Sequence, residues 1–276
     1  MDVGKVAAAE RLARGPVTSD LSVDELGLLD ALGAAPLGLV LGSSMYHVGW
    51  QRARIMENME LTTLSQAMHT ARELAVDRME AEAASCGADG IIGVRLVLQR
   101  PAWGEGLVEF LAVGTAIGSP DHRLRPASGR PFASTLCGQD FWKLRRYGYR
   151  PVGVAFGCCV YHVAHLGLAK WVQQIGRNAE MEAFTQATYS ARENAMERMA
   201  EQARTCGADL VVGVTLGEGS WGWDANVIEF AALGTGVVRD AQRPPLPEPQ
   251  LVVRMESTAG AAGALLPPPP PPTAAR

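Results

Sequence analysis

Apolar residues recur at spacings of three and four through two long segments of the chain, one in each half. This spacing predicts an amphipathic helix in each segment, with one apolar stripe along its length. Many stripe positions are alanine, so each helix can lie close against a sheet. The stripes consist of Leu64, Met68, Ala71, Ala75, Met79, Ala83 and Cys86 in the first half, and of Phe184, Ala187, Ala191, Ala195, Met199, Ala203 and Cys206 in the second. Charged residues occupy the other face of the first helix, among them Arg72, Glu73, Asp77 and Glu80.

Shorter apolar runs flank each long helix. Residues 38–41 and 152–156 predict strands that end at a glycine. After the helix, Gly87 and Gly207 stand where a helix C-cap favours a left-handed residue. A hairpin follows in each half, and its return strand, 107–117 or 226–237, alternates between two faces. The order strand, helix, strand, strand predicts an α+β fold in which one long helix lies against an antiparallel sheet.

A short helix precedes each of these units. Ser22 and Glu25 form a capping-box pattern that opens a helix over residues 26–32. Residues 139–147 predict its counterpart in the second half.

The two halves are copies of one another. Residues 71–94 and 191–214 align at a constant offset of 120, whereas Gly42 and Tyr46 align with Gly157 and Tyr161 at an offset of 115. The second copy therefore carries five extra residues between its first strand and its long helix. We divide the chain into a flexible N-terminus (1–18), copy one (19–118), a linker (119–131), copy two (132–239) and a disordered proline-rich tail (240–276).

The repeated features resemble the YbjQ-type family of small bacterial proteins, which are described as heavy-metal-binding. They are the Ala-Arg-Glu helix at residue 71, the Gly-Ala-Asp turn at 87, the Gly-Val strand at 93 and the closing Gly-Thr at 114, each found again in the second half. The resemblance covers most of residues 36–117 and 151–238, in a tandem form similar to an actinobacterial branch. It implies a dodecin-like fold that assembles through sheet edges into closed rings, often pentamers.

Composition excludes several classes of protein. The 276 residues carry a net charge of −4 with 47% hydrophobic residues, which is unlike a nucleic-acid binder or a wholly disordered chain. No stretch approaches the ~20 apolar residues of a membrane span, and the first residues lack a signal-peptide pattern. Five scattered cysteines do not form a secreted disulfide framework. We expect a cytoplasmic protein whose proline-rich tail is either a spacer or a ligand for a protein partner.

A set of soft ligands in copy two is the best candidate metal site. It consists of Cys158, Cys159, His162 and His165, which would suit Zn²⁺ or Cu⁺. Adjacent cysteines point to opposite sides of an extended chain, so one of them would be misdirected. Copy one has Ser43, Ser44, His47 and Gly49 at the matching positions. We therefore favour small packing residues here, and no other cofactor is predicted.

Other polar or aromatic residues recur in both copies. As contact candidates we take Tyr46, His47, Trp103 and Glu109 of copy one, and Tyr161, His162, Trp221 and Glu229 of copy two. A glutamate within a strand is unusual, and Glu109 and Glu229 could face a pore, an interface or a metal. We favour solvent-facing ion pairs, for instance between Glu109 and Arg95, although Thr215 at the matching place in copy two weakens that idea. Cys86 and Cys206 end the helical stripes, where a thiol acts as a small apolar group and its pKa is raised.

Neither a catalytic motif nor an assembled catalytic set occurs in the sequence. A three-stranded sheet with one helix leaves open edges and a half-covered face. We therefore predict a non-enzymatic protein that self-assembles into rings, with its own two domains pairing inside the chain. A metal-binding protein and a small-molecule binder are the alternatives.

Overall fold

The computed structural model describes residues 16–47, 58–99, 107–163, 182–220 and 227–240, without the side chains of residues 182, 183 and 220. The chain divides into two compact units, Met1–Pro244 and Pro245–Arg276, and every described residue belongs to the first. Most of the predicted tail, residues 1–15 and both predicted contact residues at the hairpin tips, Trp103 and Trp221, lie outside the described residues.

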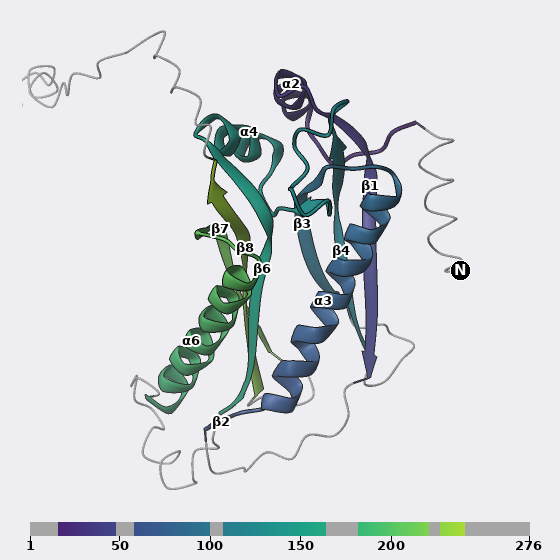
Figure 1. Cartoon of the computed structure of the whole chain (residues 1–276). Helices are drawn as coiled ribbons and strands as arrows, with labels where there is room; N and C mark the ends of the chain where they lie inside the picture. Colours follow the sequence, from purple (N-terminus) through teal and green to yellow (C-terminus); the bar gives the residue numbers. More distant parts are fainter. Residues whose placement is uncertain (1–15, 48–57, 100–106, 164–181, 221–226, 241–276) are drawn as a thin grey trace, which may run out of the picture. The chain divides into compact units, whose positions relative to one another are not determined.

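Each half of the chain contains a short helix, a long helix and strands. The first half has α2 (Val23–Ala31), β1 (Ala35–His47), β2 (Met59–Glu60), α3 (Thr62–Ser85), β3 (Gly90–Gln99) and β4 (Leu107–Gly118). The second half has β5 (Phe132–Ala133), α4 (Gly138–Arg146), β6 (Tyr149–His162), α6 (Glu182–Thr205), β7 (Leu210–Ser220) and β8 (Val227–Arg239). This order confirms the predicted mixed α+β fold with a repeated strand–helix–strand unit (Figure 1).

Two four-stranded sheets result, with strand orders β1-β4-β3-β5 and β2-β6-β8-β7. Three strands of each sheet are the predicted antiparallel set, and the fourth is a two-residue strand supplied by the other half of the chain. Strand β2 joins β6 antiparallel, and β5 joins β3 in parallel. Because an unpaired edge leaves N–H and C=O groups without partners, each half contributes backbone to the other half's sheet.

The sheet register repeats the offsets found in the sequence. Gly42 faces Ala112 in the first sheet, and Gly157 faces Ala232 in the second. A register shift follows Pro36 in β1 and Pro151 in β6. The five extra residues of copy two therefore leave the strand pairing unchanged.

Each long helix crosses its first strand at a glycine. A Cβ atom at Gly42 would overlap the carbonyl oxygen of Ala75, and one at Gly157 would overlap that of Ala195. The small residues of the predicted stripes allow this close approach, since Ala71, Ala75 and their counterparts in α6 are fully buried. Gly87 and Gly207 follow the helices with φ of +76° and +73°, as the C-cap prediction requires.

Helix α3 packs against both sheets. On one side it shares a core with Val40 and Phe110 of the first sheet, and on the other with Phe156 and Val160 of the second. Alternate residues of β6, including Ala155, instead pack against α6, because consecutive side chains of a strand point to opposite faces. The layers therefore run first sheet, α3, second sheet, α6 (Figure 1).

The short helices begin and pack much as the sequence suggests. Ser22 and Glu25 form both hydrogen bonds of the predicted capping box. Leu29 of α2 and Phe141 of α4 belong to one buried cluster, and Glu25 accepts a hydrogen bond from the backbone N–H of Gly138 at 2.8 Å. The helix that opens each copy thus contacts its counterpart.

Candidate functional site: the seam between the two copies

Helix α3 of copy one covers the face of the second sheet that α6 leaves open. We call this contact the seam. From α3 it includes Ser65, His69, Arg72 and Val76, and from the second sheet Val154, Phe156, Cys158, Val160 and Glu229. The apolar members belong to a single core cluster that spans both copies. Burying a side chain such as Phe156 contributes ~1.5–3 kcal/mol, so the seam is part of the core of the fold.

An ion pair between Arg72 and Glu229 crosses the seam, and each side chain is only 9% exposed. The guanidinium of Arg72 lies over the ring of Phe110, 4.6 Å from its centroid, and donates to the carbonyl oxygen of Met68 at 3.3 Å. Burial by itself would lower the pKa of Arg72, but the charge of Glu229 outweighs it and raises the pKa. A shift of α3 along the sheet would leave a buried charge unpaired, so this pair fixes the alignment of the two copies.

Backbone groups join the copies at the edge of β6. The N–H of Val160 donates to the Ser65 hydroxyl at 2.9 Å, and the N–H of Leu61 donates to the carbonyl oxygen of Val160 at 2.8 Å. Beside them, Arg198 of α6 forms an ion pair with Glu60 of β2 at 2.7 Å. Copy one therefore supplies backbone partners to the end of the β6 edge of copy two.

His69 sits in the middle of the seam. Its ring centroid lies 4.8 Å from that of Phe156, and its Nε2 lies 3.6 Å from a carboxylate oxygen of Glu73. Burial lowers the pKa of His69, and the charge of Glu73 only partly opposes this. The imidazole is therefore a neutral packing group at neutral pH.

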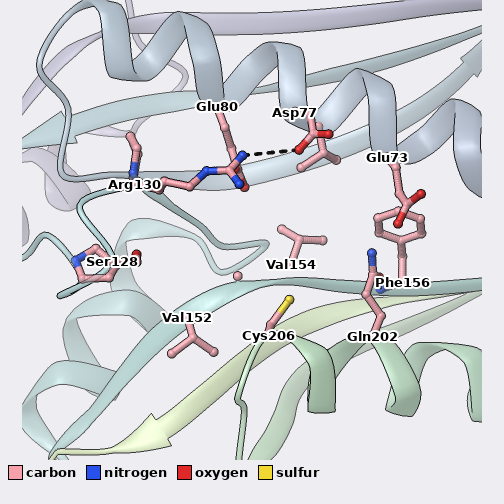
Figure 2. A pocket seen from close by; sticks show the side chains of 14 residues that line it. Glu73, Asp77, Glu80, Ser128, Arg130, Val152, Val154, Phe156, Gln202 and Cys206 are labelled. Carbon is pink, nitrogen blue, oxygen red and sulfur yellow. Dashed lines mark hydrogen bonds and ion pairs between the residues drawn. The ribbon is translucent and has the colours of Figure 1, made fainter.

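A cavity of about 370 Å³ opens beside the seam. Figure 2 shows Asp77 and Glu80 of α3 near Arg130, with Cys206 across the cavity. Arg130 lies 3.5 Å from Glu80 and 3.6 Å from Asp77. Burial raises the pKa of Glu80 to about 7, although Arg130 partly opposes the shift.

The bases that the described lining of the cavity offers to the Cys206 thiol are carboxylates. Burial, and to a lesser extent the charge of Glu80, raises the pKa of the Cys206 thiol. Neither histidine nor lysine is found among the described residues that line the cavity. Because burial and the charge of Glu80 both raise the thiol pKa, the Cys206 thiolate is disfavoured and the thiol is not activated.

The structure separates the members of the predicted metal set. Cys158 packs in the seam and Cys159 packs beside α6, on opposite faces of β6. Burial raises the pKa of Cys158 to about 11 and that of Cys159 to about 12, which disfavours the thiolates that bind metals. His162 is buried on β6, and His165 lies outside the described residues. Within the described ranges no cluster of three potential ligands occurs, and the metal set stays a prediction.

The repeated contact candidates have different surroundings in the two copies. His162 is buried where β2 and β8 flank it, whereas its counterpart His47 is exposed. Glu229 lies in the seam, whereas Glu109 is on the outer face of the first sheet. The tyrosines, Tyr46 and Tyr161, both pack partly buried against core clusters.

The expected solvent-facing ion pairs are not what the structure shows. Arg95 pairs with Asp20 at 2.8 Å, and Glu229 is buried with Arg72. The charged face that the sequence assigns to the first long helix is thus partly covered, because the second sheet lies against it.

Two buried charged residues are not among the predicted site residues. The sequence places Arg72 on the charged face of a helix and Asp89 in a turn. Asp89 is fully buried and accepts hydrogen bonds from the Ser119 N–H at 2.9 Å and from its hydroxyl at 2.6 Å. Burial would raise the pKa of Asp89, but these bonds and the contact with His122 lower it. The signal for both was available, since each recurs at an offset of 120 as Arg192 and Asp209.

Comparison with known protein families gives a match in each half of the chain. The YbjQ family, described as "Putative heavy-metal-binding", matches residues 37–119 and 152–240. This chain belongs to the YbjQ family. The predicted resemblance is confirmed, and the two matched segments are the two copies that meet at the seam.

Relatives of this tandem YbjQ protein differ in how much of the chain they match. An encapsulin nanocompartment protein of Mycobacterium tuberculosis is 42% identical over 91% of this chain and 97% of its own length. UPF0145 proteins of Clostridium perfringens and Pseudothermotoga lettingae are 38% and 34% identical over 29% of this chain, and over 78% and 79% of their own lengths. The first relative therefore spans both YbjQ copies, and the others correspond in length to one. Within the described segments, none of the helices is long and apolar enough to cross a membrane.

Proposed function

We propose that this YbjQ protein is a non-enzymatic, self-assembling protein that forms closed oligomers and acts as a component of an encapsulin nanocompartment. The observation that carries the proposal is the seam. A helix-on-sheet contact with a buried ion pair and shared backbone hydrogen bonds joins two homologous domains within the chain. The same domains have further helix and sheet surfaces that face solvent.

The chemistry of the described residues supports assembly over catalysis. Polar side chains in the seam are paired with one another, as in Arg72 with Glu229 and Arg198 with Glu60. The cavity beside the seam holds a thiol whose pKa is raised. Catalytic sites instead place a nucleophile beside a base that activates it.

The relative from Mycobacterium tuberculosis supports the nanocompartment part of the proposal. Its name describes an encapsulin nanocompartment protein, and its alignment with this chain includes both copies. The residues that form the seam therefore lie within the matched length, which supports a common mode of assembly.

Size-exclusion chromatography with light scattering of the untagged full-length protein tests the assembly. The expected result at micromolar concentration is one species at a multiple of the 29.4 kDa chain. The substitution Arg204→Glu, at an exposed position of α6, serves as a control that should leave this mass unchanged. A mass of a single chain for the unmodified protein would contradict the proposal.

Coexpression with an encapsulin shell protein tests the second part. The expected result is that the chain sediments with the shells through a sucrose gradient. If the chain forms oligomers but stays at the top of the gradient, the assembly proposal stands and the nanocompartment role is wrong.

A further inference from the structure

The surfaces that the seam buries have counterparts in the other copy that are exposed or partly exposed. The long helices correspond at an offset of 120 residues and the first strands at an offset of 115. The counterpart of α3 is α6, and the counterpart of the covered face of the second sheet is the outer face of the first sheet. Within one chain these two surfaces cannot meet each other, because the seam already occupies the middle of the layer order.

The outer face of the first sheet is apolar where the seam is apolar. Leu41 and Met45 of β1 are 45% and 50% exposed, and they correspond to Phe156 and Val160, which the seam buries. On β4 the same face carries Leu107, Leu111 and Val113, the counterparts of Val227, Ala231 and Leu233 in the shared core. Among the described residues, the first sheet therefore presents a partly exposed apolar face of the kind that α3 covers in the second sheet.

The exposed side of α6 matches the side of α3 that enters the seam. Tyr189 is 55% exposed and corresponds to His69, whose ring packs at a tilt against that of Phe156. Arg192 corresponds to Arg72, and its side chain is 41% exposed, with its guanidinium over the Tyr189 ring at 4.8 Å from the centroid. Helix α6 thus carries an aromatic ring and an arginine at the positions that α3 uses to contact the second sheet.

The acidic residue of the seam also has a counterpart on the outer face of the first sheet. Glu109, the counterpart of Glu229, lies on the outer face of the first sheet between Leu107 and Leu111. Its position on this face matches that of Glu229 on the face that α3 covers. A glutamate among leucines is costly to cover unless a cation meets it, and Arg192 is the residue that the internal contact assigns to that role.

The strand edges show the same asymmetry. In copy one, β5 pairs with β3, and Gly90 and Val94 are buried. In copy two their counterparts, Leu210 and Val214 of β7, are exposed. The counterparts of β5 are residues 17 and 18, and Val17 is exposed as well. A second chain placed by the same operation would bring these two exposed segments together.

We infer that α6 of one chain docks on the outer face of the first sheet of a second copy, where Arg192 pairs with Glu109 of that copy as Arg72 pairs with Glu229 inside the chain. The inference rests on the proposed self-assembly and specifies its interface. The contact is head-to-tail: each chain offers α6 at one end and its first sheet at the other.

Charge reversal tests this interface. Arg192→Glu and Glu109→Arg each place like charges in the contact, which costs several kcal/mol. Each single variant is expected to raise the midpoint concentration of dissociation by at least about a hundredfold. The double variant Glu109→Arg with Arg192→Glu restores opposite charges and should recover the oligomer. Arg204→Glu on the same helix is the matched control, since its counterpart Ala84 is exposed beside the seam.

A mixture of the two single variants gives a second, independent rescue. Each variant keeps one unmodified surface, and in an equimolar mixture every contact between unlike chains carries opposite charges. Assembly should therefore return on mixing, which a merely misfolded variant would not do. Circular dichroism melting of each single variant at concentrations below the dissociation midpoint checks that the chain is folded.

The outcomes separate the interface from the function. If the unmodified protein is oligomeric and the single variants keep its mass, this interface is wrong and self-assembly stands. If the single variants dissociate and neither the double variant nor the mixture recovers the oligomer, the pairing of Arg192 with Glu109 is wrong. If the unmodified protein is a single chain, both proposals fall.

Discussion

Gly42 and Gly157 show how single residues set the distance between helix and sheet. At each position a Cβ atom would overlap helix backbone, which cannot move aside as a flexible side chain can. The two glycines occupy the same place in their copies, so the close approach of helix to strand is a feature of the repeated unit. Alanine at the neighbouring helix positions serves the same purpose.

Gly157→Ala is therefore expected to destabilise the protein by about 1–3 kcal/mol through overpacking. Thermal unfolding followed by circular dichroism measures the effect. Gly27→Ala in α2 is the matched control, because a Cβ there meets nothing within 4 Å. Removing a glycine from an exposed helix position stabilises by about 0.5–1 kcal/mol, so the two substitutions should shift the melting temperature in opposite directions.

The raised pKa of Glu80 predicts that the stability of the protein falls as the pH rises. In the folded state Glu80 has a pKa of about 7, above the ~4.3 of a glutamate in an unfolded chain. Its contribution to stability is fully present below pH ~4.3 and is lost as pH rises through 7, since charging the buried carboxyl favours the unfolded state. Between pH 5 and pH 8 the melting temperature of the unmodified protein should fall further than that of Glu80→Gln.

Asp77→Asn is the control for this measurement, because Asp77 faces the same Arg130 but is 63% exposed. The charge of Asp77 is the smallest of the causes that act on the pKa of Glu80, and burial is the largest, so this variant should keep most of the pH dependence of the unmodified protein. Equal pH slopes for the unmodified protein and Glu80→Gln would show that Glu80 titrates normally.

At the scale of elements, α3 differs from an ordinary surface helix because both of its sides are covered. The apolar stripe meets the first sheet, and the opposite side carries the ion pair to Glu229 and the hydroxyl of Ser65 into the second. Among the described residues, the core clusters that include α6 lie on the side of that helix that faces the second sheet. Corresponding elements of the two copies thus have different surroundings, and the proposed docking of a second chain would make them alike.

Arg72→Ala is expected to lower the free energy of unfolding by about 3–5 kcal/mol, because it leaves Glu229 buried without its partner. Denaturant unfolding measures the loss. Arg204→Ala breaks the exposed pair with Glu201 and should change the free energy of unfolding by less than about 1 kcal/mol. Similar losses for both substitutions would mean that the seam pair is solvated.

The sequence predicted the elements well because their signals are local. Spacing of three and four located both long helices, and the capping box at Ser22 located the start of α2. Strands β2 and β5 were not predicted, because a strand of two residues shows no periodic pattern of apolar positions. The pair of Arg72 with Glu229 joins residues 157 positions apart, and only a packed structure brings them together. The repetition of Glu109 and Glu229 marked the right residues, but their environment could not be read from one strand alone. The boundaries assigned to the two copies stay a prediction, and backbone pairing across them shows how closely the copies are joined.

For the whole molecule, a head-to-tail contact either closes into a ring or continues into a filament. The seam already fixes the contact between the two domains of one chain, and we expect repetition of this contact between chains to close into a ring. Native mass spectrometry should then show one dominant oligomer whose number of chains does not change with concentration. A ladder of masses that lengthens as the protein is concentrated would indicate an open filament instead.

The duplication restricts the number of domains that a closed ring of this protein can contain. Because covalent connection joins domains in pairs, any closed circle that uses one kind of contact throughout contains an even number of domains. A ring of five single domains, the arrangement expected from the family, contains an odd number of domains. Whole two-domain chains therefore cannot build it. Duplication of the domain within one chain would then have changed the size of the assembled ring as well as its stability.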